Sequence, residues 1–361
     1  MEARNESNVI IKKQLQNCWN WLGINAASGL KQDKSIRETE NSIIQHFAQA
    51  GVRTIPKTKR ANSLFEESVT GSKEELEASL GTEKLLLPFG GGSTLMPPEF
   101  ADDIDSYLRW LEDKNALKFG YLSRSFQCNG LHGGMRQLLV DWILQLKRTF
   151  SLTSETISLA IFVLDRALMQ MAKSLTKQNL QLVGTASLLI ACKYEEIIVP
   201  RIADFAYMTK GTFTPNQILQ MEQSVLQAVD YQISCAHSIQ FMRRYRYYMQ
   251  VPKQVYNLAK FISEVALVFY PLAHYKPSIV AAVSLYLASV AHTLSIVSTV
   301  YSNCLRLDER EVVSVACKFV PFVLEMAAPN GKYHALYDNF KKVAGLPLSN
   351  DQINRLKLLL D

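Results

Sequence analysis

The apolar positions of this chain recur at the spacing of helices. Over residues 135–146, one side of a helix would carry Met135, Leu138, Leu139, Trp142 and Leu146. The opposite side is also apolar, because Val140 and Ile143 lie there. A helix that is apolar nearly all round is packed by neighbours on most sides. This run therefore predicts the central helix of a helical domain.

Two charged residues, Arg136 and Asp141, lie inside this apolar run. Burying a charge is costly unless the charge is paired or hydrogen-bonded. We therefore expect the fold to supply a partner for each of them.

Helix-start signals recur along the rest of the chain. Residues 153–156 can cap a helix over 157–171, Thr214-Pro215 opens one over 216–229, and Pro277 opens another. Alternating apolar runs and hairpin turns, the signals of strands, are rare. From residue 98 onward the pattern predicts an all-α protein.

An internal repeat divides this helical part. Residues 183–191 align with residues 280–288, and both segments are rich in small side chains that let neighbouring helices approach closely. Because only two copies occur, we expect two helical domains of one design rather than a solenoid.

Residues 1–98 differ from the rest of the chain. Two helical patterns, near 9–22 and 36–50, are followed by a breaker-rich stretch with three consecutive glycines at 90–92. This stretch lacks the Gly-Lys-Ser/Thr sequence of a phosphate loop, so it reads as a linker. We expect residues 1–98 to be largely mobile.

Composition and charge disfavour several classes of protein. The net charge of +6 is spread among acidic residues, unlike the clustered basic patch of a nucleic-acid binder. The six cysteines show no C-x-x-C spacing, which indicates reduced thiols of an intracellular protein without a zinc site. No nucleophile–base arrangement or cofactor motif is apparent, so we expect neither an enzyme nor a bound cofactor.

One segment is long enough to raise the question of a membrane span. Residues 277–305 contain no Asp, Glu, Lys or Arg, but they carry many Ser and Thr residues and lack a basic flank. The N-terminus has no apolar core of a signal peptide. A buried core helix followed by a loop fits this segment better, and we expect no membrane association.

Several sequence blocks, in order, resemble the cyclins, the regulatory subunits of cyclin-dependent kinases. The matching blocks are residues 135–143, 165–166, 180–184, 191–196, 220–222, 241–244 and 275–279. Residues 99–108 are similar to the extra N-terminal helix of mitotic cyclins, and residues 193–196 and 241–244 look more like the B-type than the A-type subgroup. The resemblance implies tandem five-helix cyclin-box domains with an extra N-terminal helix.

The resemblance covers about residues 98–340 and suggests the domain bounds. We expect a first cyclin box over 99–237, with its N-terminal helix at 99–113, and a second cyclin fold over 238–361.

The resemblance also implies that the chain binds and activates a cyclin-dependent Ser/Thr kinase at G2/M. Lys193 and Glu222 match the contact residues and would pair with each other and with the kinase. Read without the resemblance, they form an ordinary surface salt bridge. The matching apolar contacts are Leu189, Tyr194, Leu226, Tyr231 and Ile233, joined by Phe100, Ile104 and Tyr107 of the N-terminal helix.

The family further implies a shallow groove that docks Arg-x-Leu motifs of substrate proteins. Its matching residues are Met135, Leu138, Leu139, Trp142 and Gln181. The alternative is that these residues are core, which suits Leu139 best, whereas Met135 and Trp142 suit groove walls. Arg136 and Asp165 match a buried structural ion pair.

Arg243 and Lys260 match a phosphate pocket of B-type cyclins, although Tyr256 stands where a His is expected. The alternative is a solvated basic face. Residues 1–98 contain neither a destruction box nor a Lys-Glu-Asn motif. With the short basic run 57–60, we expect the protein in the nucleus and the cytoplasm. The competing functions are a cyclin-fold scaffold and a transcription-type cyclin.

Overall fold

The computed structural model describes residues 87–88, 95–96, 98–123, 130–249, 251–294, 298–303, 305–329 and 331–360. They belong to one unit that runs from Leu86 to Asp361. Strand β1 (Leu87–Pro88) pairs antiparallel with β2 (Leu95–Met96), and the rest of the regular structure described is helical. The helices expected at 9–22 and 36–50, and the mobility expected of 1–98, concern residues that lie almost entirely outside the described part.

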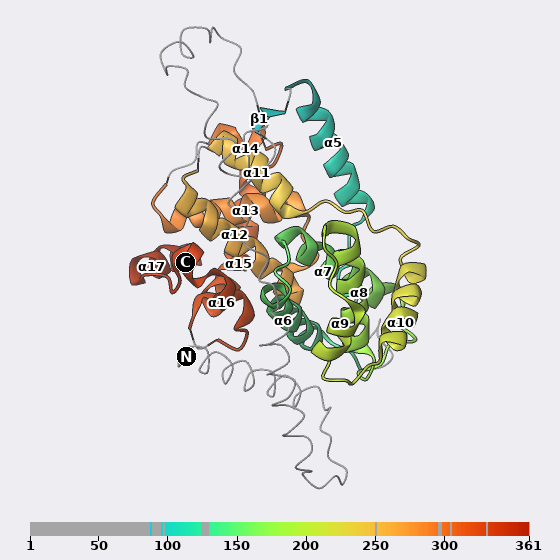
Figure 1. Cartoon of the computed structure of the whole chain (residues 1–361). Helices are drawn as coiled ribbons and strands as arrows, with labels where there is room; N and C mark the ends of the chain where they lie inside the picture. Colours follow the sequence, from blue (N-terminus) through green and yellow to red (C-terminus); the bar gives the residue numbers. More distant parts are fainter. Residues whose placement is uncertain are drawn as a thin grey trace, which may run out of the picture. The chain divides into compact units, whose positions relative to one another are not determined.

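The first repeat consists of five helices preceded by an additional one. Their bounds are α5 (Pro98–Lys114), α6 (Gly133–Thr149), α7 (Ser154–Gln170), α8 (Leu180–Glu195), α9 (Ile202–Met208) and α10 (Pro215–Ala228). Helix α8 contacts the other four helices of the repeat, and its residues from 180 to 192 are all buried. Helix α8 is therefore the central helix of this repeat (Figure 1). The prediction that the apolar run at residues 135–146, which lies in α6, forms the central helix is corrected.

The second repeat has the same number of helices around α13. Their bounds are α11 (Ser238–Met249), α12 (Lys253–Val268), α13 (Pro277–Ala291), α14 (Ser298–Asn303) and α15 (Glu309–Ala327), with a 3-10 turn η1 (Tyr270–Leu272). They are followed by α16 (Ala335–Phe340), a π-helical turn η2 (Lys341–Gly345) and α17 (Asn350–Lys357). The predicted all-α fold of tandem five-helix repeats with an extra N-terminal helix is confirmed.

The local helix signals act as the sequence indicated. Thr153 accepts a hydrogen bond from the Thr156 backbone N–H at the start of α7, and Thr214 forms a capping box with Gln217 at the start of α10. The helix opened by Pro277 ends at Ala291, so the charge-free run continues beyond it. Within the described ranges, no helix has the length and apolar character that crossing a bilayer requires.

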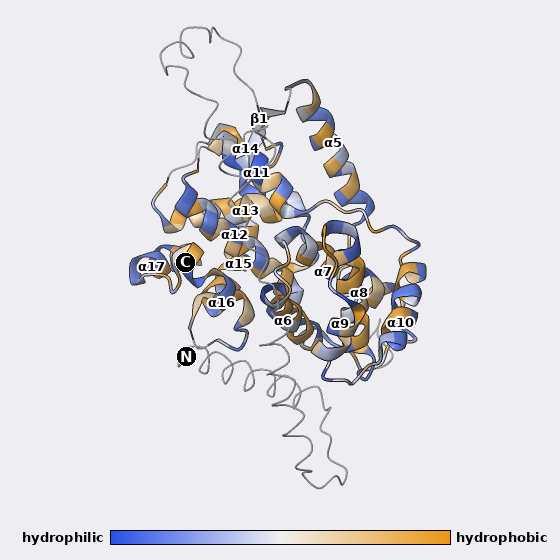
Figure 2. Ribbon diagram, in the orientation of Figure 1, coloured by the Kyte–Doolittle hydropathy of each residue, from blue (hydrophilic) through white to orange (hydrophobic). Residues whose placement is uncertain are grey.

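Small side chains let the central helix α8 approach its neighbours. A Cβ atom added at Gly184 would lie 2.8 Å from Leu139 Cδ1, a distance that real Cβ contacts do not show. The absence of a side chain at Gly184 therefore makes room for Leu139 of α6, which is buried. Figure 2 shows the apolar residues along α8, in contrast to the alternation of polar and apolar residues along α5.

The arginine of a buried ion pair within the first repeat also bonds to the second repeat. Arg136 Nε and Nη2 of α6 donate to Asp165 Oδ1 and Oδ2 of α7 at 2.6 and 2.7 Å, and Tyr121 also donates to Asp165. Arg136 Nη1 donates to the carbonyl oxygens of Leu267 and Val268 at the end of α12, both at 2.9 Å. The predicted structural pair is thus confirmed, and it also caps a helix of the second repeat.

Helix α5 is held by the second repeat. Arg109 Nη2 donates to the Leu305 carbonyl at 2.6 Å, and Glu112 accepts from the Ser278 backbone N–H and hydroxyl at 2.9 and 2.7 Å. Asp105, which is buried, lies 3.7 Å from Arg244 Nε of α11. These bonds fix the position of α5 relative to the helices that follow it.

Asp141 of α6 is buried without a cation at ion-pair distance among the residues that the structure describes, and its expected partners are hydrogen-bond donors. Its carboxylate accepts hydrogen bonds from the Ala335 backbone N–H and the Gln145 amide, both at 3.2 Å. Burial raises the pKa of Asp141 to about 6, although these bonds oppose the shift. Tyr333 and Asn339 add hydrogen bonds to α6, which tie the segment after α15 to the first repeat.

Replacing Arg136 tests how strongly the fold depends on its buried pair. Arg136→Met leaves the Asp165 carboxylate buried without its cation, so we expect it to lower the free energy of unfolding by about 3–5 kcal/mol. Urea unfolding measures this loss. The double variant Arg136→Met/Asp165→Leu is expected to lose less than the sum of the two single variants. Additive losses would contradict the coupling.

The raised pKa of Asp141 gives a pH dependence of known sign. Because the folded state binds this proton more tightly than the unfolded state, Asp141 lowers stability as pH rises from about 4 to about 6, by at most about 3 kcal/mol. Above that range its effect is constant. Asp141→Asn is expected to remove this part of the pH profile, as measured by denaturant unfolding of both proteins from pH 4 to 7.5. Parallel profiles for the two proteins would contradict the assignment.

Candidate functional site

Lys193 and Glu222 form an ion pair at the surface of the first repeat. Lys193 Nζ, in the last turn of α8, lies 2.6 and 2.9 Å from the two carboxylate oxygens of Glu222 on α10. The Lys193 side chain is 49% exposed and that of Glu222 is 10% exposed. The predicted pairing of these two residues is confirmed. An ammonium group has three N–H donors, so Lys193 keeps at least one for a further acceptor.

The predicted apolar residues around this pair divide by exposure. Tyr194 and Tyr231 are more than half exposed, and Leu226 and Ile233 are half-buried. Leu189 is 2% exposed, so its predicted place on a contact surface is corrected. Neighbouring helices cover that side of α8, and Leu189 belongs to the core beneath the ion pair.

The turn after α10 presents Tyr231 in an uncommon backbone conformation. Asp230 and Tyr231 both adopt the left-handed region, with φ values of 52° and 54°. Such a conformation costs on the order of 1 kcal/mol for a non-glycine residue and persists only where the surroundings enforce it. Arg166 holds the turn from behind by donating to the Gln232 carbonyl at 2.8 Å. The fold thus maintains this turn with the Tyr231 side chain at the surface.

Helix α5 adds further aromatic side chains to the surface. Phe100 and Tyr107 are exposed as predicted, and Ile104 is half-buried. Trp110, which the sequence reasoning missed, is 53% exposed. Its ring centroid lies 5.8 Å from that of Tyr107 in a stacked arrangement, and Lys114 Nζ lies 4.9 Å from it.

Hydrogen bonds connect the end of α5 with the ends of α8 and α10. Asn115 Nδ2 donates to the Ser234 carbonyl at 3.0 Å, and the Ser234 hydroxyl lies 3.4 Å from the Tyr194 hydroxyl. We call the exposed residues along this connection the aromatic surface; they are Tyr107, Trp110, Tyr194 and Tyr231. The aromatic surface thus draws on α5, α8 and the turn after α10, and its Tyr194 directly follows Lys193 of the ion pair in the sequence.

Two exposed isoleucines extend this apolar character beyond α8. Ile197 is fully exposed and Ile198 is 68% exposed, directly after the helix ends. The sequence reasoning missed them because they fit no helical or strand period. Three β-branched residues between a helix end and Pro200 are the signal that could have identified them.

The predicted docking groove is only partly open. Met135 and Leu138 are half-buried, whereas Leu139, Trp142 and Gln181 are buried. Leu139 is part of the core, in agreement with one of the two interpretations. Trp142 was predicted to form a wall of the groove, but only 4% of it is exposed, so this prediction is corrected. Trp142 Nε1 and Gln181 Oε1 find no hydrogen-bond partner within the described ranges. A buried donor and a buried acceptor therefore remain unsatisfied here.

Comparison with known proteins places this arrangement in a family. Residues 103–234 match the family model described as "Cyclin, N-terminal domain", and residues 237–346 match "Cyclin, C-terminal domain". Together the two matches cover more than half of the chain. The chain belongs to the cyclin family.

This cyclin is similar in sequence to several B-type members. It is 34% identical over 267 residues to G2/mitotic-specific cyclin-B of Arbacia punctulata, covering 71% of this chain and 64% of that protein. For G2/mitotic-specific cyclin-B2 of Oryzias luzonensis the identity is 36% over 192 residues, or 53% of this chain and 48% of that protein. The cyclin thus spans about half to two thirds of the length of these relatives.

Solved structures share its fold. A viral cyclin from herpesvirus saimiri superposes with a TM-score of 0.54 at 20% identity, covering 64% of this chain and 99% of that chain. A chain of the yeast RNA Pol II CTD kinase CTDK-1 complex superposes with a TM-score of 0.51 at 15% identity, covering 70% and 80%. At these identities the similarity concerns the fold of the cyclin.

The cations of the predicted phosphate pocket surround Tyr256 of α12. Lys260 Nζ and Arg246 Cζ lie 4.7 and 4.5 Å from the centroid of its ring. Burial lowers the pKa of Lys260, and the charges of Arg243 and Arg246 lower it further. Arg243 forms a short ion pair with Glu155 of α7. Phosphate binding by Arg243 and Lys260 stays a prediction, and a phosphate would compete with Glu155.

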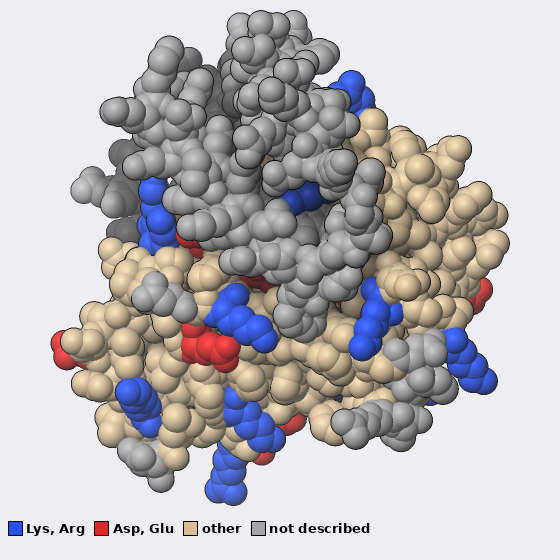
Figure 3. Space-filling model, turned by 90° about the horizontal axis from the view of Figure 1, so that it is seen from below, with Lys and Arg blue, Asp and Glu red and all other residues tan. Residues whose placement is uncertain are grey.

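No other chemistry stands out in the described part of this cyclin. No group of three or more His, Cys, Asp or Glu residues there could hold a metal ion, and Cys192, Cys235 and Cys317 are free thiols. On the face drawn in Figure 3, the described basic side chains stand apart from one another. The expectation that the cyclin does not bind nucleic acid stays a prediction.

The half-exposed geometry of the Lys193–Glu222 pair predicts a small contribution to folding. In the free cyclin we expect a double-mutant cycle with Lys193→Ala and Glu222→Ala to give a coupling free energy below about 1 kcal/mol. Denaturant unfolding of the four proteins measures it. A coupling of several kcal/mol would show that the pair serves the fold, and its assignment to a binding surface would lose its basis.

Proposed function

We propose that this protein is a B-type cyclin that binds and activates a cyclin-dependent Ser/Thr kinase and recruits its substrates at G2/M. The observation that carries the proposal is the Lys193–Glu222 pair beside the exposed aromatic surface. The names of the G2/mitotic-specific relatives support the mitotic role. The cyclin would contribute no catalytic group of its own.

The two parts of the surface have different physical roles in this proposal. Burying an exposed side chain such as Ile197 or Tyr231 against the kinase contributes about 1.5–3 kcal/mol each. The ion pair contributes register and specificity, because its charges discriminate among partners more than they add affinity. Aromatic anchors of this kind are the usual hot spots of interfaces.

Activation would follow from a rigid surface that contacts the small lobe of the kinase. Pressing on the regulatory helix of that lobe aligns the Lys–Glu ion pair that phosphoryl transfer needs. The bonds from α5 to the second repeat, and from Arg166 to the turn after α10, hold the aromatic surface in place before binding. A preorganised surface loses little conformational entropy on binding.

We further propose that the groove of α6 and α8 docks Arg-x-Leu motifs. Met135 and Leu138 supply accessible apolar surface, and the buried Trp142 N–H and Gln181 carbonyl would bond to a peptide backbone once the groove opens around them. An unpaired buried polar atom costs about 1–3 kcal/mol, which a docked peptide would recover. Gln145 is neutral and already donates to Asp141, so the cationic end of the motif would be selected weakly.

We propose the nucleus and the cytoplasm as the locations of the protein. The short basic run at residues 57–60 is the sequence feature that supports entry into the nucleus.

The first test of the proposed function is kinase activation. The full chain is mixed with a cyclin-dependent kinase that B-type cyclins activate, and histone phosphorylation and complex formation are measured. We expect Lys193→Ala/Glu222→Ala to reduce histone phosphorylation and complex formation at least tenfold each, because the cyclin loses the charges that set its register on the kinase.

A charge-matched control separates this effect from a general change of surface charge. Glu311→Ala/Lys318→Ala removes one acid and one base from exposed positions of α15. It is expected to leave activation unchanged. If the wild-type chain activates no cyclin-dependent kinase, the proposal is contradicted and the alternative of a scaffold or transcription-type cyclin is favoured.

The groove is tested with a synthetic Arg-x-Leu peptide. Met135→Ala is expected to weaken peptide binding about fivefold, because it removes about 1 kcal/mol of apolar contact. Fluorescence anisotropy measures the affinity. Met249→Ala, a half-buried methionine at the end of α11, serves as the control. Equal affinities for both variants would place the peptide elsewhere.

A further inference from the structure

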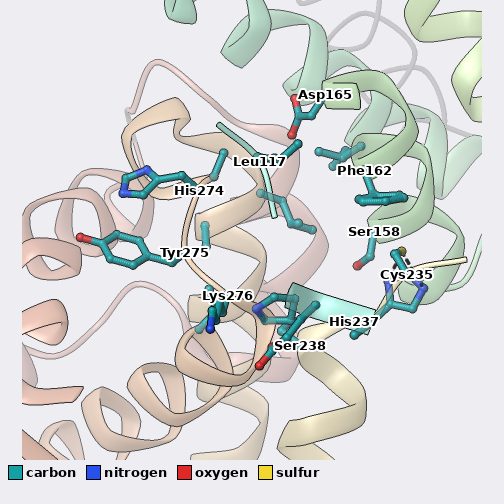
Figure 4. A pocket seen from close by; sticks show the side chains of 18 of the residues that line it. Leu117, Ser158, Phe162, Asp165, Cys235, His237, Ser238, His274, Tyr275 and Lys276 are labelled. Atoms are coloured by element: carbon teal, nitrogen blue, oxygen red, sulfur yellow. Dashed lines mark hydrogen bonds between the residues drawn. The ribbon is translucent and has the colours of Figure 1, made fainter. Parts of the chain in front are cut away.

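A cavity of about 120 Å³ lies between the two repeats, and none of the residues that define the aromatic surface or the groove lines it. Its apolar walls come from both repeats. Ile161 and Phe162 of α7 and Leu117 after α5 line the first side, and Leu272 and Val280 line the second. Figure 4 shows Phe162 and Ser158 on one side of this space and His274 and Tyr275 on the other, with His237 and Ser238 near its lower end.

The charged residues that line the cavity already have partners. Arg136 and Asp165 bond to each other and to further atoms of both repeats. Glu112 accepts two hydrogen bonds from Ser278, and Lys276 pairs with Asp113 at 2.6 Å. A charged ligand would therefore enter a space that offers its charge no free counter-ion, which is unfavourable.

Uncharged polar groups, in contrast, remain available. The hydroxyl groups of Ser158 and Ser238 make no hydrogen bond within the described ranges, and both residues line the cavity. The His237 ring lies 3.7 Å from the Cys235 thiol, which can occupy only one of its two nitrogens. Burial lowers the pKa of His237 to about 4, so the ring is neutral at physiological pH. It can then donate or accept one further hydrogen bond.

We propose that this cavity binds a small uncharged aromatic molecule with one hydroxyl or N–H group, of the size of phenol or indole. An apolar cavity of about 150 Å³ accommodates benzene, so the volume fits a single ring, with modest adjustment of the walls for indole. The apolar walls would enclose the ring, and His237, Ser158 or Ser238 would bond to its polar group. A mostly apolar pocket with a few convergent polar groups at a domain interface is the usual form of a small-molecule site.

Binding at this position would stabilise the packing of the two repeats. The ligand would contact α7 and the residues after α5 on one side and α12 and α13 on the other. It would therefore bind the two repeats packed together and not the separated repeats. By linkage, such a ligand raises the unfolding temperature of the whole chain as its concentration rises. The site does not depend on the kinase surface, so this proposal stands or falls separately from the proposed function.

The test uses phenol and indole as probes on the full chain, with benzoate as a charged probe of similar size. Titration calorimetry measures binding, and ¹⁵N-histidine NMR follows the ring nitrogens of His237, assigned with His237→Gln. We expect phenol or indole to bind and to shift the His237 signals, and benzoate to bind at least tenfold more weakly. Absence of binding by both phenol and indole up to their solubility overturns the proposal.

Two matched substitutions locate the binding. Ser158→Leu fills the cavity from α7 and is expected to weaken phenol and indole at least tenfold, whereas Ser224→Leu on the exposed face of α10 leaves them unchanged. Equal affinities in both variants place the probes elsewhere and overturn the proposal. If Ser158→Leu does not fold, Ala116→Leu at an exposed position lining the cavity replaces it and is judged by the same outcomes.

Discussion

The structure depends above all on the guanidinium group of Arg136. A buried cation must satisfy its N–H donors within the protein. Two of its nitrogens bond to the Asp165 carboxylate, and the third bonds to two carbonyl oxygens at the end of α12. One side chain therefore fixes α6, α7 and α12 at once. The cavity between the repeats is lined by α7, by α12 and by Arg136 itself, so this bonding pattern holds its walls in register.

The sequence predicts best what is decided locally. The starts of α7, α10 and α13 follow from capping residues and prolines that act within one turn of helix. The two small-residue helices follow from the internal repeat. The Lys193–Glu222 pair is different, because its residues lie 29 positions apart on two helices whose mutual placement no periodicity gives. That pairing could be predicted only from the resemblance to cyclins.

Exposure is the property that the sequence predicts least well, because tertiary packing decides it. Leu189 and Trp142 are apolar residues of helices, and so is Trp110, yet only Trp110 reaches the surface. The neutralisation of Arg243 by Glu155 also escaped prediction, since 88 residues separate them. In both cases the deciding partner comes from another helix, and its identity is not encoded near the residue concerned.

The segment after α15 returns to the first repeat, and this return has a consequence for synthesis on the ribosome. Tyr333, Ala335 and Asn339 bond to α6 across 194 to 196 residues of sequence. The first repeat emerges long before these partners do, so the surface of α6 that they cover stays incomplete until residues 333–339 have been translated. Contacts of such separation form late. The surface of α6 that these residues cover is therefore completed only when the segment after α15 docks on the first repeat.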